Sequence, residues 1–258
     1  MDLVTTSDEL RRQYEKLLLK RDRYRYLAKR QLYAYQCEFG QLIADSFRKK
    51  ISCVEKKKAI AFCQARVNRG EPVDQNALRR YLADEMAEYN ARLQEMIETN
   101  EAFRNAKAVP ESELMKIKHI YRNLAKKLHP DIFPATGEND KLRELWNRVV
   151  DAYQRNNLQD ISELEVLVAK ALEDEGGSYD KIAIPNLEFK ISKLESEIET
   201  IVSTDPYRYK DLLSDPTLVA EKKDELQREI EEYAAYEEEL RSILDTLLMN
   251  GAIIQWEN

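Results

Sequence analysis

Apolar residues recur along most of this chain at intervals of three and four positions, which is the spacing of an amphipathic helix. One clear stripe repeats at i, i+4, i+7 and i+11 and consists of Ile117, Tyr121, Leu124 and Leu128. A second stripe with the same spacing consists of Leu142, Trp146, Val149 and Tyr153. No convincing alternation of apolar and polar positions, the mark of a strand, interrupts this pattern, and residues 182–184 are the one ambiguous run. The pattern therefore predicts an all-α fold.

Helix-breaking residues separate the two stripes. Pro130 cannot continue a helix and biases His129 away from helical geometry, so the first helix is expected to end near Leu128. The residues that follow contain further breakers and predict a loop, after which Asn139 or Asp140 can cap a second helix. Two stripes joined by a short loop predict an antiparallel helix pair. This arrangement places Pro130 and its neighbours at an exposed tip.

Two longer helical patterns flank this pair. Residues 7–106 predict a long helical hairpin that turns at residues 69–72, Arg-Gly-Glu-Pro. Residues 186–249 predict a second hairpin. Its return helix carries a coiled-coil-like seam that repeats every seven residues: Leu226, Tyr233, Leu240 and Leu247. The seam is expected to pack within the chain against the apolar stripe just upstream, and a dimer interface is the alternative.

These patterns divide the chain into four consecutive parts. Residues 1–109 predict a basic helical hairpin, and residues 110–175 a central helical module. Residues 176–185 begin with two glycines and predict a linker. Residues 186–258 predict an acidic helical hairpin. The expected architecture is thus a short antiparallel helix pair flanked by two long, coiled-coil-like hairpins.

The composition agrees with long solvated helices. Charged residues make up 34% of the 258 residues, whereas glycine and proline are few. The chain does not begin with a basic stretch and an apolar core, as a signal peptide would, and it has no apolar run of membrane-spanning length. Cys37, Cys53 and Cys63 are sparse and odd in number, which indicates buried thiols in a reducing compartment. We therefore expect a cytoplasmic protein with no membrane partner.

The sequence shows no constellation of catalytic or cofactor-binding residues. It has no glycine-rich phosphate loop, and its only histidines are His119 and His129. Neither a metal-ligand set nor a cysteine and histidine placed for nucleophilic catalysis can be recognised. We expect no catalytic residues, no cofactor and no metal, and so a protein that is not an enzyme.

Basic residues are concentrated in the N-terminal hairpin, including the runs 48–50 and 56–58, whereas residues 186–258 are acidic. Charge runs on helices usually form solvated or internally paired faces, and the chain as a whole carries a net charge of −7. The acidic hairpin is a candidate counterpart for the basic helix, either within the molecule or in another copy. Nucleic-acid binding by residues 11–58 is a disfavoured alternative, and the oligomeric state stays open.

The residues around Pro130 resemble the signature of the J-domain, the module by which co-chaperones activate DnaK-type ATP-driven chaperones. The tripeptide His129-Pro130-Asp131 follows a helix with an apolar residue, a tyrosine four positions later and a Leu-Ala pair. These are Ile117, Tyr121 and Leu124-Ala125, and the family's third helix is matched by Trp146, Val149 and Ala152-Tyr153. The resemblance covers about residues 111–173.

The resemblance implies binding without chemistry by this chain. A basic ridge before the tripeptide would meet an acidic face of the chaperone's ATPase domain, and the tripeptide would contact the chaperone specifically. The implied chaperone-binding residues are Lys118, Tyr121, Arg122, Lys126, Lys127, His129, Pro130 and Asp131. The expected function is that of a J-domain-like co-chaperone that stimulates the ATPase of a DnaK-type chaperone. The flanking hairpins would bind a client protein or an adaptor.

The chain departs from the family pattern in three places. No short helix with a tyrosine and a Leu-Gly pair precedes Ser112, so we expect the N-terminal region to take over its packing role. Asn123 occupies a position that is usually basic, and Ile132-Phe133 follow the tripeptide where a basic residue is usual. A helical scaffold whose J-like core is no longer coupled to a chaperone is therefore an alternative function.

Overall fold

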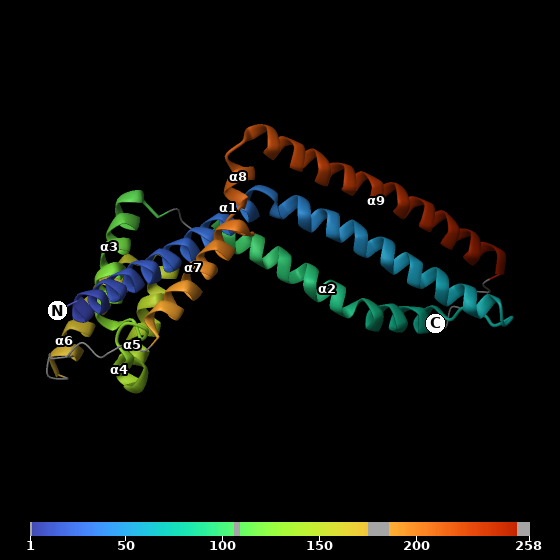
Figure 1. Cartoon of the computed structure of the whole chain (residues 1–258). Coiled ribbons are helices and arrows are strands. Elements are labelled where there is room, and N and C mark those ends of the chain that lie inside the picture. The colour runs from blue at the N-terminus through green and yellow to red at the C-terminus, as the bar shows by residue number, and fades with distance from the viewer. Residues whose placement is uncertain (1, 106–108, 175–185, 252–258) are drawn as a thin grey trace. The chain divides into compact units, whose positions relative to one another are not determined.

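The computed structural model describes residues 2–105, 109–174 and 186–251. Throughout these ranges every regular element is a helix, which confirms the predicted all-α class (Figure 1). The helices are α1 (Asp2–Val67), α2 (Gln75–Asn105), α3 (Glu111–Leu128), α4 (Pro134–Glu138), α5 (Asp140–Gln154), α6 (Leu158–Asp174), α7 (Leu187–Ser203), α8 (Tyr209–Leu213) and α9 (Pro216–Gly251). Among the described residues, none of these helices combines the length and apolar character needed to cross a membrane.

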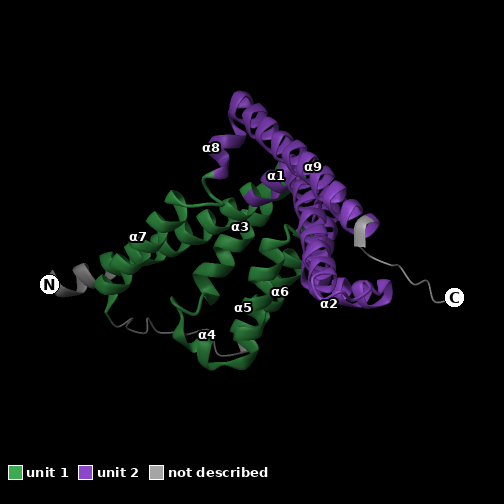
Figure 2. Cartoon of the chain, turned by 90° about the vertical axis from the view of Figure 1, so that its right-hand side faces the viewer, with its two compact units in different colours: residues 1–31, 107–208 green, residues 32–106, 209–258 purple. Residues whose placement is uncertain are grey.

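The chain folds into two compact units (Figure 2). Unit 1 combines residues 1–31 with residues 107–208, and unit 2 combines residues 32–106 with residues 209–258. This division differs from the four consecutive parts expected from the sequence, because α1 contributes to both units. The expected C-terminal hairpin is likewise divided, with α7 in unit 1 and α9 in unit 2. The expected linker, residues 176–185, lies outside the described residues.

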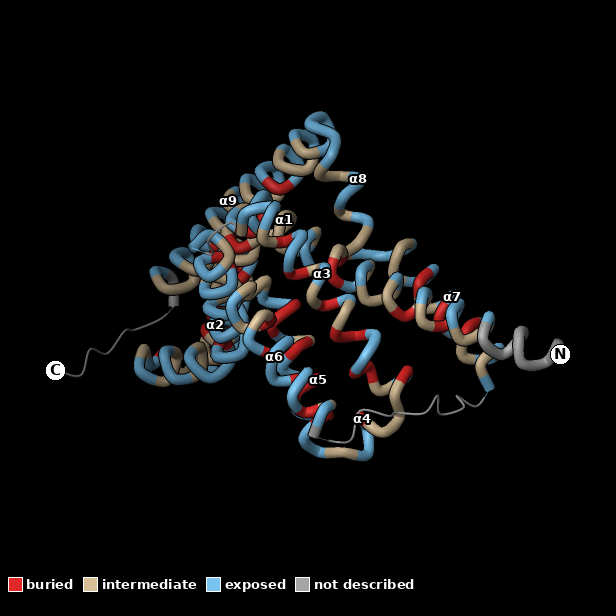
Figure 3. Tube along the Cα trace, turned by 90° about the vertical axis from the view of Figure 1, so that its left-hand side faces the viewer, coloured by how far each residue is buried: buried red, intermediate tan, exposed pale blue. Residues whose placement is uncertain are grey.

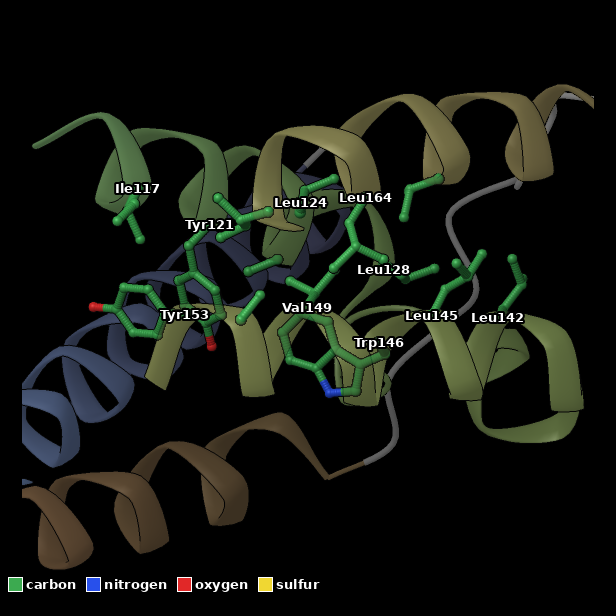
Figure 4. Close-up of a cluster of buried hydrophobic side chains, with 14 of the residues drawn as sticks. Ile117, Tyr121, Leu124, Leu128, Leu142, Leu145, Trp146, Val149, Tyr153 and Leu164 are labelled. Carbon is green, nitrogen blue, oxygen red and sulfur yellow. The ribbon is translucent and has the colours of Figure 1, made fainter. Parts of the chain in front are cut away.

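The core of unit 1 is formed by α3, α5 and α6, whose buried positions are red in Figure 3. All eight residues of the two apolar stripes are buried, as predicted, and Figure 4 shows their side chains along the space between the helices. The ring of Tyr121 stacks on Tyr153 with centroids 4.0 Å apart, and the ring of His129 lies 4.8 Å from Trp146. These pairings show that α3 and α5 run in opposite directions. Helix α6 closes the core with Ile161, Leu164, Val168 and Ala171.

The N-terminal part of α1 packs on this core. Tyr26 is buried, stacks on Tyr153 at 4.8 Å, and donates a hydrogen bond to the side chain of Asn156. Leu19 and Leu27 of α1 also contact the cluster. The N-terminal region therefore packs on α3 and α5. The sequence has no short helix directly before α3 that could do so.

In unit 2, α2 and α9 flank the remainder of α1 (Figure 1). The predicted N-terminal hairpin turns at Gly70, whose φ of +66° is in the left-handed region that favours glycine. Asn100 of α2 donates a 2.7 Å hydrogen bond to the carbonyl of Gly40, so the two helices approach closely there. Cys53 and Cys63 are buried as expected. Cys37 is exposed, so the expectation of buried thiols is wrong at this outward-facing position.

The partner of the α9 seam is α1. Leu226 and Leu240 of α9 are buried, and the Cys53 thiol donates to the carbonyl of Tyr233 at 3.3 Å. The seam therefore packs within the chain, as expected, although its partner is not the upstream stripe. That stripe lies on α7 in unit 1, where Ile191 and Leu194 pack in a separate apolar cluster.

Candidate functional site

The loop after α3 starts with the tripeptide that the sequence singled out. Helix α3 ends at Leu128, as predicted, and His129 caps it with extended backbone while its N–H donates to the carbonyl of Ala125 at 3.0 Å. Pro130 has no N–H to continue the helix. The N–H groups of Ile132 and Phe133 donate to the His129 carbonyl at 2.9 and 2.8 Å. The loop is thus a tight turn that closes on His129.

The side chain of His129 is 6% exposed, and its imidazole lies between two carboxylates. Its Nδ1 accepts a 3.1 Å hydrogen bond from the N–H of Asp131, which places the ring proton on Nε2. Nε2 faces a carboxylate oxygen of Asp22 at 3.9 Å. Burial lowers the pKa of His129 more than Asp22 and Asp131 raise it, and Arg21 lowers it further. The ring is therefore neutral at pH 7.

The expectation of an exposed tip is wrong for His129. Asp22 of α1 and Trp146 of α5 cover its ring. Pro130 is half-buried, whereas the Asp131 side chain is 47% exposed. The tip of a helix pair is exposed only when no third element lies on it. Here α1 does so, and its covering residue is more than a hundred positions upstream.

Asp22 is the central residue that the sequence analysis missed. It accepts a 2.8 Å hydrogen bond from the Tyr121 hydroxyl and forms a 2.9 Å ion pair with Arg21. Burial and the adjacent Asp22 carboxylate raise the pKa of Tyr121 far above its ordinary value. The only signal in the sequence is a single carboxylate among the arginines at 21, 23 and 25. Tyr121 thus belongs to the core and to this network, and it offers little surface to a partner.

The residues that follow the tripeptide are also covered. Ile132 is 1% exposed and forms a cluster with Tyr14 and Leu18 of α1 and with Ile191 and Leu194 of α7. Phe133 packs against the edge of this cluster. Two helices that are remote in sequence therefore clamp the loop.

The basic residues of α3 remain available at the surface. Arg122, Lys126 and Lys127 are exposed and Lys118 is half-buried. Among the described residues no carboxylate lies within ion-pair distance of these four cations. Arg23 of α1 is exposed as well, and it lines a shallow hollow with Lys118 and Arg122 above the rings of Tyr121 and Tyr153. Helix α1 thus adds a cation beside Lys118 and Arg122 of α3.

A cavity of about 420 Å³ opens beside His129. Its lining combines the cations Arg25 and Lys29 with the rings of Trp146 and Tyr153. The parts of the chain that the structure describes hold no group of three His, Cys, Asp or Glu side chains arranged to bind a metal ion. Among the described residues that line the cavity there is no serine, threonine or cysteine.

Comparison of the chain with protein-family models, with curated proteins and with solved structures found no match. The function must therefore be inferred from the site itself. The site combines a neutral, buried imidazole, an exposed carboxylate at Asp131 and a row of exposed cations. Such an arrangement is suited to recognising a protein surface by charge and hydrogen bonds.

Proposed function

We propose that this protein is a J-domain-like co-chaperone that docks on a DnaK-type chaperone and stimulates its ATPase. The observation that carries the proposal is the position of the tripeptide. It directly follows a helix whose buried face belongs to the core of unit 1 and whose exposed face carries cations that form no ion pair with any described residue. A cytoplasmic location and an unidentified client for the helical arms belong to the same proposal.

Electrostatics supports docking on an acidic surface. Arg122, Lys126 and Lys127 lie along α3 without a counter-charge in the part of the chain that the structure describes, and Arg23 extends the same basic surface onto α1. Like charges held together repel one another, and an acidic partner relieves that repulsion while it speeds association. Arg21 and Arg25, the neighbouring arginines of α1, form ion pairs with carboxylates, whereas Arg23 forms none with any described residue.

Asp131 would provide the specific contact at the end of this surface. Its carboxylate is exposed, while its backbone N–H is held by His129 Nδ1. The imidazole therefore fixes the direction of the loop, and the carboxylate remains free to accept hydrogen bonds from a cationic group of the chaperone. Docking accelerates ATP hydrolysis only if the loop binds one state of the chaperone more tightly than the other.

Single-turnover ATP hydrolysis by DnaK-type chaperones of the host organism tests the proposal. We expect the parent chain to accelerate hydrolysis and Asp131→Asn and His129→Gln to abolish the acceleration. His119→Gln is the matched control, because His119 is an exposed histidine on the same helix, and it should behave as the parent does. The proposal fails if neither the parent nor Glu197→Lys, which weakens the contact of α7 with α1, accelerates hydrolysis by any of these chaperones.

A helical scaffold without chaperone coupling is the second candidate, and the burial of His129 and Ile132 favours it. Nucleic-acid binding by the basic helix receives less support, because Lys49 and Lys56 from its basic runs form 2.9 Å ion pairs with Glu237 of α9. The scaffold reading predicts that tripeptide variants leave every interaction of the protein unchanged.

A further inference from the structure

The apolar cluster over the loop is separate from the main core of unit 1. It joins Ile132 to Tyr14 and Leu18 of α1 and to Ile191 and Leu194 of α7. The main core consists of residues from α3, α5 and α6 together with Tyr26 of α1, and it contains no residue of α7. Removal of α7 would therefore uncover the side of Ile132 that faces Ile191 and Leu194 and leave the main core intact.

Helix α7 has a small buried face. Its buried residues are Ile191, Leu194 and Ile198. The side of the helix that carries Phe189 is turned outward, and Phe189 itself is 72% exposed. The hydrophobic stabilisation of a helix grows with the apolar area it buries, so three side chains hold α7 far less firmly than the main core holds α3 or α5.

Ion pairs fasten α7 to α1 beside the loop. Glu197 of α7 pairs with Arg25 and lies 3.8 Å from Arg21, which in turn holds Asp22 over His129. The side chains of Glu197 and Arg25 are 32% and 56% exposed. Ion pairs at this exposure are weak and screened by salt, so they can open reversibly.

From these contacts we propose that α7, fastened to α1, is an autoinhibitory cover of Ile132 and Phe133, the two residues that follow the tripeptide. This inference rests on the proposed co-chaperone function. In the covered state the basic face of α3 can meet an acidic surface of the chaperone and Asp131 can meet a cationic group, whereas Ile132 is withheld. Closure of α7 and full docking of the chaperone exclude each other, so a partner that binds the buried face of α7 would activate the protein.

Thiol labelling tests the cover without any chaperone. Ile132→Cys in a Cys37→Ser background places a reporter under α7, since Cys53 and Cys63 are buried. Glu197→Lys replaces the fastening pairs by repulsion from Arg21 and Arg25. We expect it to accelerate maleimide labelling of position 132 about tenfold. Glu195→Lys is the matched control, because it reverses the same charge at an exposed position of the same helix, and it should leave the rate unchanged.

Hydrogen exchange in the chain with natural residue 132 provides a second measurement, in case the reporter itself loosens the cluster. Exchange of α7 and of the amides at 132 and 133 should accelerate in Glu197→Lys, while exchange of α3 and α5 stays slow. The cover is refuted if position 132 of the Ile132→Cys, Cys37→Ser chain, with Glu197 unchanged, is labelled as fast as exposed Cys37 is in the natural chain. It is also refuted if Glu197→Lys changes neither labelling nor exchange.

The ATPase assay then separates the cover from the co-chaperone function. Stimulation by Glu197→Lys should exceed that of the parent and of Glu195→Lys about tenfold at limiting protein concentration. Faster labelling with equal stimulation by parent and variant would refute the inhibitory role of α7. Faster labelling with no stimulation by either would instead refute the co-chaperone function.

Discussion

His129 lies between Asp22 and Asp131 but is too deeply buried to bind a proton readily. Its Nδ1 is already an acceptor for the Asp131 N–H. A second proton would break that hydrogen bond and place a charge beside the Trp146 ring, with Arg21 close by. The fold thus selects the neutral imidazole as the group that orients the loop.

This selection predicts a pH dependence of stability. The pKa of His129 is lowered from 6.5 in the folded protein, so the unfolded chain binds more protons near that pH. The contribution of neutral His129 to the free energy of unfolding should therefore be complete above pH 6.5. It should be lost as the pH decreases through 6.5 toward the pKa of the folded state. Urea unfolding at pH values from about 7.5 to 5.5 measures this fall. His129→Gln should flatten it, whereas an equal fall in His129→Gln and the parent would contradict the assignment.

At the scale of elements, helix ends were predictable and helix contacts were not. Leu128 is the last residue of α3 because Pro130 acts locally on the backbone. Asn139, one of two predicted caps, accepts hydrogen bonds from the N–H groups of Lys141 and Leu142 at 3.0 and 3.2 Å. Gly40 of α1 lies in close contact with Asn100 of α2, a residue sixty positions further along the chain.

The contact at Gly40 predicts an unusual effect of Gly40→Ala. Alanine favours a helix interior over glycine by about 1 kcal/mol, but a Cβ at this position would collide with the Asn100 side chain. We expect the free energy of unfolding to decrease by about 1–3 kcal/mol, because overpacking outweighs helix propensity. Gly137→Ala is the control, since nothing lies within 4 Å of a Cβ there. Denaturant unfolding of both variants would test the contact, and a stabilised Gly40→Ala would argue against it.

At the scale of the whole molecule, opposite charges from distant parts of the chain meet within unit 2. Glu237 of α9 accepts hydrogen bonds from Ser52 at 2.7 Å and from Lys49 and Lys56 at 2.9 Å. These contacts lower the pKa of Glu237 from 4.5 to about 2. At Glu237 the acidic C-terminal helix therefore complements the basic N-terminal helix within one chain.

Glu237→Gln should destabilise the protein by about 1–3 kcal/mol at pH 7, because two ammonium groups lose their counter-charge. The contribution of Glu237 is complete above pH 4.5 and is lost as the pH falls toward 2, so the variant and the parent should converge in acid. Urea unfolding at pH 7 and at pH 3 measures both effects. Glu239→Gln, an exposed position on the same helix, should cost little, and a comparable loss in that variant would show that the ion pairs are not the cause.

The sequence by itself determined the all-α class, the buried stripes of α3 and α5, and the turn at His129, although it predicted a loop where the short helix α4 lies. Each of these depends on residues a few positions apart, through helical periodicity or through the backbone limits of proline. The tertiary structure alone decided that Asp22 covers His129, that α7 clamps Ile132, and that α9 packs on α1. Those contacts join residues from about sixty to almost two hundred positions apart. Each helix could have packed against any of several apolar stripes elsewhere in the chain. Local sequence patterns therefore could not determine which helix it packs on.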